Sequence, residues 1–122
     1  MAEFEADGCL FCRIANGEIP VKLIAQNAHA VAFRDLHPQA PVHVLVIPRR
    51  HVASLAEATD AEEVGALALL AAEIARTEGI AEGGYRTVMN TGVDGGQSVF
   101  HLHLHLLGGR TMTWPPGLPS SP

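Results

Sequence analysis

Three histidines alternate with leucines at residues 101–107, which read His-Leu-His-Leu-His-Leu-Leu. A period of two is typical of a β-strand, so we expect His101, His103 and His105 on one face and the leucines on the buried face. Neighbouring imidazoles would then lie about 6.6 to 7 Å apart. Such a row can titrate near neutral pH, attack as a nucleophile or bind a metal ion.

A glycine-rich loop, Thr91–Ser98, leads into this segment. Its glycines allow backbone N–H groups to approach an anion, although a simple hairpin turn has the same composition. Beside imidazoles the loop indicates a phosphate site, because N–H donors and a protonated histidine stabilise charge on phosphate oxygens. The middle imidazole, His103, suits covalent attack on phosphorus if its second nitrogen is held as N–H. Ser98 either passes a proton to the leaving group or caps its own turn.

Both cysteines of the chain lie in one unit, Cys9-Leu10-Phe11-Cys12. Residues 1–7 are acidic and contain no apolar signal-peptide core, so we expect a cytoplasmic protein and no structural disulfide. A structural zinc site needs about four ligands, and histidines would have to supply the other two. A thioredoxin-like redox pair is the rival interpretation, but the βαβ setting that it requires is missing.

The composition limits the class of protein. The 122 residues are 48% hydrophobic and 17% charged, with a formal net charge of −5, which fits one globular domain. Without a basic stripe, a nucleic acid polymer is excluded as the expected partner, whereas a small nucleotide is not. The chain also lacks a run of 18 or more apolar residues, so no membrane partner is expected.

The apolar periodicity predicts an α+β fold in which helices pack on an antiparallel sheet. Thr59 or Asp60 caps the main helix, which ends at Gly79. Asp35 has two candidate roles: it either caps a turn or binds ribose hydroxyls. The expected elements are a short helix at 9–15, strands at 21–26, 29–34, 42–47 (ended by Pro48), 85–90 and 101–107, a loop at 35–41 and an irregular tail.

Together these motifs resemble the histidine-triad (HIT) superfamily, and within it the purine nucleoside phosphoramidase branch. The triad motif, histidines separated by single apolar residues, is complete at residues 101–107. Further matches lie at residues 17–20, 35–43, 46–51, 94–100, 107–110 and 114–117.

The resemblance implies a single HIT domain over residues 1–122, with one long and one short helix on a five-stranded sheet. It also implies a homodimer whose sheet continues from one subunit into the other, with dimer contacts from the tail at 111–122. The implied reaction cleaves the bond between a purine nucleoside monophosphate and an amine. His103 would attack the α-phosphorus, His105 would contact the phosphate, and Ser98 would serve the leaving group.

The resemblance also implies the substrate contacts. Apolar side chains would sandwich the purine, Asp35 would bind the ribose, Asn90 would lie near phosphate and sugar, and Trp114 would reach the neighbouring subunit's pocket. The full implied set is Leu10, Phe11, Ile14, Ile19, Phe33, Asp35, Leu36, Asn90, Gly96, Gln97, Ser98, His103, His105 and Trp114.

Superfamily members that carry a Cys-x-x-Cys pair hold zinc with two histidines, and the matching positions imply the ligands Cys9, Cys12, His43 and His101. Such a closed site is structural and supplies no chemistry, because it leaves no open coordination position. His43 has two candidate roles, zinc ligand and active-site proton relay, and the ligand role is favoured.

Three other functions remain open. The first is a related hydrolase of dinucleoside polyphosphates or adenylyl sulfate, and the second is a nucleotide-binding scaffold without activity. The third is a metal-dependent oxidase or cupin-like centre, which leaves the glycine-rich loop unexplained.

Overall fold

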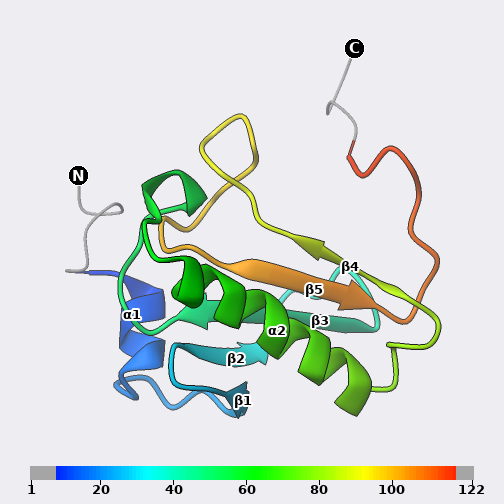
Figure 1. Ribbon diagram of the computed structural model, residues 1–122, viewed down its shortest axis with the longest axis horizontal. Helices are drawn as coiled ribbons and strands as arrows, with labels where there is room; N and C mark the ends of the chain where they lie inside the picture. The colour runs from blue at the N-terminus through cyan, green and yellow to red at the C-terminus, as the bar shows by residue number, and fades with distance from the viewer. Residues whose placement is uncertain (1–7, 118–122) are drawn as a thin grey trace.

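The computed structural model describes residues 8–117, which form one five-stranded antiparallel sheet with a helix on each face (Figure 1). The strands lie in the order β1-β2-β3-β5-β4. Their bounds are β1 Leu23–Gln26, β2 Ala30–Arg34, β3 Val42–Pro48, β4 Tyr85–Val88 and β5 Leu104–Gly108, and the helices are α1 Leu10–Ala15, the 3-10 turn η2 Leu55–Glu57, and α2 Ala61–Thr77. The predicted α+β fold, with one long and one short helix, is confirmed.

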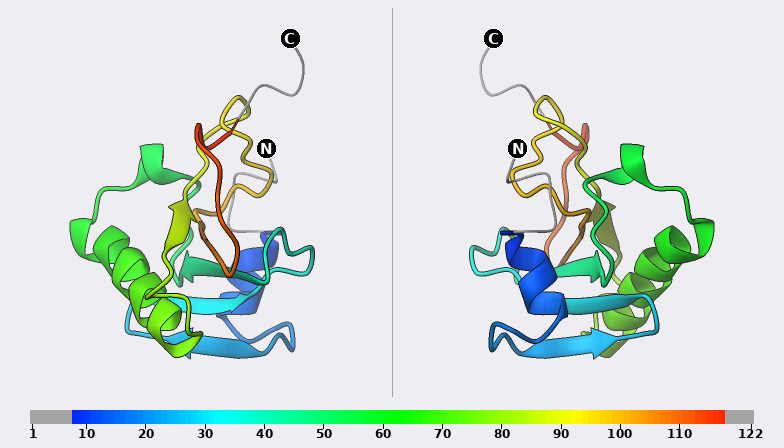
Figure 2. Two further views of the ribbon diagram at one scale, coloured as in Figure 1. Left: turned by 90° about the vertical axis from the view of Figure 1, so that its right-hand side faces the viewer. Right: turned by 90° about the vertical axis from the view of Figure 1, so that its left-hand side faces the viewer.

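Alternation along β3 divides its side chains between two cores. Val44 and Val46 belong to a core with α2, whereas Leu45 and Ile47 belong to a second core with α1. Figure 2 shows the two helices on opposite sides of the sheet. The same alternation on β5 sends Leu104 and Leu106 toward α2, which leaves His105 on the α1 side.

Helix α2 covers one face of the sheet because its apolar residues recur at helical spacing. Of the two candidate caps, Asp60 occupies the N-cap position, and its carboxylate accepts from the backbone N–H groups of Glu62 and Glu63. Leu67, Leu70, Ala71, Ile74 and Ala75 are buried against the sheet. Gly79 ends the helix with a φ of +76°, the left-handed conformation that favours glycine.

Helix α1 is only six residues long, so its stability must come from packing rather than from its own hydrogen bonds. Phe11 and Ile14 are buried in the second core beside Phe33 and Leu45. The predicted helix at 9–15 begins one residue later, because Cys9 is its N-cap and the Cys9 Sγ accepts from the Cys12 N–H at 3.3 Å. Both cysteines are thereby fixed at the start of the helix.

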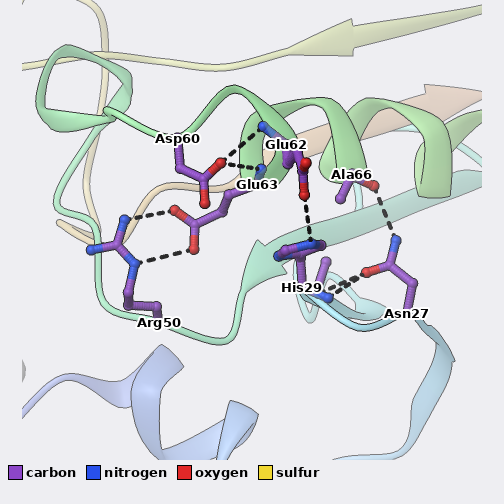
Figure 3. A network of polar contacts seen from close by, with 8 residues as sticks. Asn27, His29, Arg50, Asp60, Glu62, Glu63 and Ala66 are labelled. Atoms are coloured by element: carbon purple, nitrogen blue, oxygen red, sulfur yellow. Dashed lines mark hydrogen bonds and ion pairs between the residues drawn. The ribbon is translucent and has the colours of Figure 1, made fainter.

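Polar contacts join α2 to the residues that follow β3 and to the turn between β1 and β2 (Figure 3). Arg50 donates from two nitrogens to the carboxylate of Glu63, at 2.8 and 3.3 Å, and Glu63 is only 5% exposed. Asn27, in the predicted turn between β1 and β2, accepts from two backbone N–H groups and donates to the Ala66 carbonyl on α2. These contacts position the residues that follow β3.

The histidine strand is shorter than predicted. Backbone pairing on β5 begins at Leu104 rather than at residue 101. Before that point the chain makes other hydrogen bonds in place of β5 pairing. The Leu102 N–H donates to the carbonyl of Val52, and the His101 ring donates from Nε2 to the carbonyl of Pro48. The other strands are trimmed at their ends relative to the predicted ranges, except β3, which includes Pro48 as the partner of Ala30.

Residues 111–117 contain no helix or strand, as predicted for the tail. The remaining predicted tail residues and the acidic residues 1–7 lie outside the described range. Among the described residues, none of the helices is long and apolar enough to cross a membrane.

Two leucines on α2 provide a matched test of the α2 core. Leu67 is fully buried, whereas Leu69 is 72% exposed. Leu67→Ala is expected to lower the free energy of unfolding by about 2–5 kcal/mol, because it removes buried methyl groups and leaves a cavity. Leu69→Ala should change it by less than about 0.5 kcal/mol. Urea denaturation measures both, and equal effects would contradict the packing of α2 described here.

Candidate active site and metal cluster

The three triad histidines follow one another on the α1 side of the sheet, but they do not form an evenly spaced row. The His103 and His105 rings are 5.0 Å apart between centroids, closer than the predicted 6.6 to 7 Å, and their planes make an angle of 62°, an edge-on arrangement. His101 is fully buried, and Phe11 from α1 packs edge-on against both His101 and His103. Helix α1 therefore covers the first two imidazoles, whereas His105 is only half-buried.

Backbone carbonyls fix the tautomers of His101 and His103. His101 Nε2 lies 2.9 Å from the Pro48 carbonyl oxygen, and His103 Nδ1 lies 2.8 Å from the His101 carbonyl oxygen. A carbonyl only accepts, so each of these nitrogens must carry the proton. In the neutral ring the other nitrogen then holds a lone pair, which is Nδ1 in His101 and Nε2 in His103.

A backbone N–H fixes the other two imidazoles of the site. The Gln39 N–H donates to His43 Nδ1 at 3.0 Å, so in the neutral ring the proton of His43 is on Nε2. That nitrogen lies 2.9 Å from His105 Nδ1, which must accept. His105 consequently carries its proton on Nε2 and keeps this N–H as a donor.

Burial keeps these rings neutral. It lowers the pKa of His101 to about 4, against the opposing hydrogen bond to Pro48, and lowers the pKa of His103. Burial, with the neighbouring His103 and His43 adding to it, lowers the pKa of His105 to about 4. Burial also lowers the pKa of His43, although the Asp35 carboxylate opposes this. At neutral pH the site offers a lone pair on His103 and an N–H on His105.

His103 and His105 border a cleft of about 290 Å³ between α1, the sheet and the entrance to the histidine segment. One wall is apolar, and His103, His105, Asp35 and Ser98 supply polar groups. Nine of the predicted site residues line it, namely Leu10, Phe11, Ile14, Phe33, Asp35, Leu36, Ser98, His103 and His105. The arrangement can hold a flat apolar group beside a polar group that reaches the imidazoles.

Five predicted substrate contacts do not line this cleft: Ile19, Asn90, Gly96, Gln97 and Trp114. The side chain of Ile19 packs on the second core, and Trp114 is 83% exposed on the irregular tail. Gln97 is buried, and its amide accepts from the Gly92 N–H and donates to the carbonyls of Ala53 and Val99.

The glycine-rich loop is a closed turn rather than an open cradle of N–H groups. The N–H groups of Gly92, Gly96 and Gln97 are all bonded within the loop. Glycine is required for this closure, because Gly96 has a φ of +86° and a Cβ on Gly95 would collide with the Thr91 carbonyl. The loop contributes to the cleft through Ser98 and Val99.

A second cluster lies behind the triad, where Cys9, Cys12, His51 and His101 bring four possible ligand atoms within 4.8 Å of one another. His101 Nδ1 is 3.3 and 3.4 Å from the two sulfurs, and His51 Nδ1 is 3.2 Å from the Cys12 sulfur. Bonds of about 2.3 Å to sulfur and 2.0–2.1 Å to nitrogen put neighbouring ligands of a tetrahedral zinc about 3.5 Å apart. Two thiols and two imidazoles at this spacing can hold a metal ion.

The prediction that His43 is the fourth ligand is wrong. The structure places His51 beside the cysteines, whereas His43 lies with Asp35 and His105. The alternation of β3 places His43 on the same side of the sheet as Leu45, and His51, three residues beyond the strand, reaches the start of α1. His43 therefore contacts the triad, through His105, rather than the cysteines.

The sequence analysis also missed several cleft residues. Val21, Arg34, His37, Leu45 and Val99 line the cleft beside the predicted ones. Leu45 had a usable signal, since it alternates with valines on β3 and therefore shares a face with His43. His51 lay in a segment already matched to the superfamily, but its distance from the cysteines depends on how α1 crosses the sheet.

A five-stranded sheet with paired imidazoles beside an apolar cleft defines a histidine-triad type of protein. A family model described as HIT domain matches residues 16–112, so the chain belongs to the HIT domain family.

Proteins of similar sequence or structure agree with this family assignment. The chain is 50% identical over 114 residues to an uncharacterized HIT-like protein of Synechococcus elongatus, covering 92% of this chain and 99% of the relative. A HIT family hydrolase from Legionella pneumophila is similar in structure, with a TM-score of 0.86 and 49% identity, covering 90% of this chain and all of that one. A HIT family hydrolase from Clostridium thermocellum matches with a TM-score of 0.83 and 42% identity over 87% of this chain and 94% of the other.

The lowered pKa of His105 predicts a pH dependence of stability. Its pKa is about 4 in the fold against 6.5 for an ordinary histidine, so between these values the unfolded chain binds more protons. The free energy of unfolding should therefore fall as the pH drops from 6.5 to 4, and His105→Gln should flatten this dependence. Urea denaturation of chelator-treated protein measures it, with Leu69→Ala as the control. An unchanged slope in His105→Gln would contradict the shift.

Proposed function

We propose that this protein is a purine nucleoside phosphoramidase, which hydrolyses the bond between a nucleoside 5′-monophosphate and an amine. The observation that carries the proposal is the hydrogen bond from His103 Nδ1 to the His101 carbonyl, at 2.8 Å, beside the cleft. It leaves the His103 Nε2 lone pair available for attack. The hydrolase names of two structural relatives support cleavage rather than binding alone.

In the first step, His103 Nε2 forms a bond to the α-phosphorus and the bond from phosphorus to the amine breaks. The electron pair of that bond goes to the amine nitrogen, which takes a proton from the Ser98 hydroxyl, and Ser98 regains a proton from solvent. The His105 N–H donates to a phosphate oxygen as charge builds there. The apolar wall formed by residues such as Phe11 and Phe33 holds the purine and sets the distance to His103.

In the second step, a water oxygen forms a bond to phosphorus and the bond to His103 Nε2 breaks. The electron pair returns to the ring, the water proton goes to solvent, and the nucleoside monophosphate is released. Asp35 lines the same cleft and binds the ribose hydroxyls in this proposal.

We also propose that the cluster of Cys9, Cys12, His51 and His101 holds a structural zinc ion. The Pro48 carbonyl orients the His101 ring so that Nδ1 faces the sulfurs, which is how metal-binding histidines are commonly held. Burial and the adjacent Cys9 raise the pKa of the Cys12 thiol to about 12, so a bound cation is needed to keep it as a thiolate. When bound, zinc supplies structural cross-linking of α1 to the triad, and four protein ligands leave no position for water.

A homodimer remains part of the proposal. Strand β4 is at the edge of the sheet, where a second copy can continue the antiparallel pairing. Tyr85 on this strand and Trp114 on the tail are exposed apolar residues, which fits burial between subunits.

His103→Asn tests the covalent mechanism. Loss of the nucleophile should lower the rate of amine release from an adenosine phosphoramidate on the order of 10³-fold or more, while adenosine monophosphate still binds. Amine release is followed by fluorescence and binding by calorimetry. His29→Asn, a histidine on the α2 side that contacts Glu62, is the matched control and should keep wild-type activity.

Turnover that survives in His103→Asn would contradict the nucleophile. A wild-type protein that binds the nucleotide but releases no amine would favour the scaffold function instead. Rates for a dinucleoside polyphosphate and adenylyl sulfate, measured beside the phosphoramidate, decide between the related hydrolases.

Metal analysis tests the zinc proposal and the exchange of His43 for His51. The purified protein is expected to hold about one zinc ion per chain, and His51→Asn or Cys9→Ala should lose most of it. His43→Asn, the matched control, should keep it. Zinc loss from His43→Asn with retention in His51→Asn would overturn the ligand set, and circular dichroism checks that each variant is folded.

A further inference from the structure

Asp35 makes contacts within the protein that the binding of a ribose would not require. Its backbone N–H donates to the His43 carbonyl at 3.0 Å, and its Oδ2 lies 3.4 Å from His43 Nε2. Its Oδ1 accepts from the His37 N–H at 2.8 Å. One oxygen of the carboxylate thus holds the turn after β2, while the other faces the imidazole that contacts His105.

The contacts around His43 leave the neutral ring a single proton arrangement. The Gln39 N–H requires a lone pair on His43 Nδ1, and an acceptor on the other side, the Asp35 carboxylate, favours the proton on Nε2. With that proton directed at His105 Nδ1, His105 has to present its Nε2–H. Asp35, His43 and His105 therefore form a short polar chain in which the Asp35 carboxylate and His105 Nδ1 both face the Nε2–H of His43.

We propose that Asp35 is a positioning residue for phosphoryl transfer, acting through His43 to hold His105 as an N–H donor, in addition to any contact with ribose. The inference rests on the proposed function, because the donor serves the phosphate of the substrate. As negative charge moves onto the phosphate oxygens, the His105 N–H is polarised and positive charge spreads over the paired rings. The Asp35 carboxylate stabilises that charge.

Two simpler interpretations compete. In the first, Asp35 only caps the turn after β2, through the contact of its Oδ1 with the His37 N–H. In the second, Asp35 only binds ribose, so that substituting it affects catalysis only when the substrate has ribose hydroxyls. A metal ion held by Asp35, His43 and His105 is a third, since their ligand atoms lie within 4.8 Å of one another. It is disfavoured because His43 Nε2 carries the proton of a 2.9 Å hydrogen bond instead of a free lone pair.

The free protein provides the first test. Asp35→Asn keeps an acceptor for the His37 N–H but offers an amide, which has no charge, to His43. Long-range ¹H–¹⁵N NMR of the histidine rings should show single Nε2–H tautomers for His43 and His105 in the wild type. In Asp35→Asn a measurable fraction of the Nδ1–H form should appear, because the Gln39 N–H is then the only one of the two groups left to select the tautomer of His43. Asp60→Asn, which keeps the N-cap of α2, is the matched control. Unchanged tautomers in Asp35→Asn would overturn the inference without any substrate.

The second test separates Asp35 from the ribose. The kcat of the wild type and Asp35→Asn is measured on an adenosine phosphoramidate and on its 2′,3′-dideoxy analogue. We expect kcat to fall roughly 10- to 100-fold on both, less than the about 10⁴-fold effect of the orienting carboxylate in a serine-protease triad, because Asp35 lies 3.4 Å from His43 Nε2 and reaches His105 only indirectly. In a His43→Ala background the same substitution should change kcat little, since the chain is already broken.

A fall that appears in KM alone, and vanishes with the dideoxy analogue, would assign Asp35 to the ribose only. A wild type that cleaves neither substrate would contradict the proposed phosphoramidase. The NMR result would still decide whether Asp35 controls the tautomers.

Discussion

The hydrogen bond from His103 Nδ1 to the His101 carbonyl is the contact on which the site depends. A carbonyl cannot donate, so this bond permits one neutral tautomer of His103, in which Nδ1 carries the proton and Nε2 carries the lone pair. The same logic applies to His101 at the Pro48 carbonyl and to His43 at the Gln39 N–H. Three backbone groups, which side-chain substitution does not remove, each favour the proton position of one imidazole, and the Asp35 carboxylate adds to this at His43 and thereby at His105.

His101 connects two parts of the molecule with different roles. Its backbone carbonyl orients His103, and its ring faces the two cysteines at the start of α1. Because α1 also supplies Phe11 and Ile14 to the cleft, the candidate metal cluster and the wall of the cleft share one short helix. Six residues cannot hold a helix in place on their own, so both the apolar packing and the cluster contribute to the wall.

Local periodicity made most of this architecture predictable. The alternation in residues 101–107 placed the leucines in the α2 core, and the apolar spacing of α2 marked its buried face, because both depend on backbone repeat alone. The ligand set was not predictable in the same way. His43 and His51 both adjoin β3, and only the crossing of α1 over the sheet determines which one meets the cysteines. The internal bonding of the glycine-rich loop was missed, because composition does not reveal that the Gly92 N–H donates to the Gln97 side chain and that the Gly96 and Gln97 N–H groups donate to loop carbonyls.

In the proposed reaction, a chain with a net charge of −5 receives an anionic phosphate because its site relies on neutral donors. Burial lowers the pKa values of His103 and His105, and the same burial therefore preserves the nucleophilic lone pair on one ring and the N–H donor on the other. A protonated His103 would bind phosphate more strongly but would have no lone pair with which to attack. Neutral N–H donors also form weaker hydrogen bonds to phosphate than charged ones do, and in the proposed reaction this would favour release of the nucleotide after each cycle.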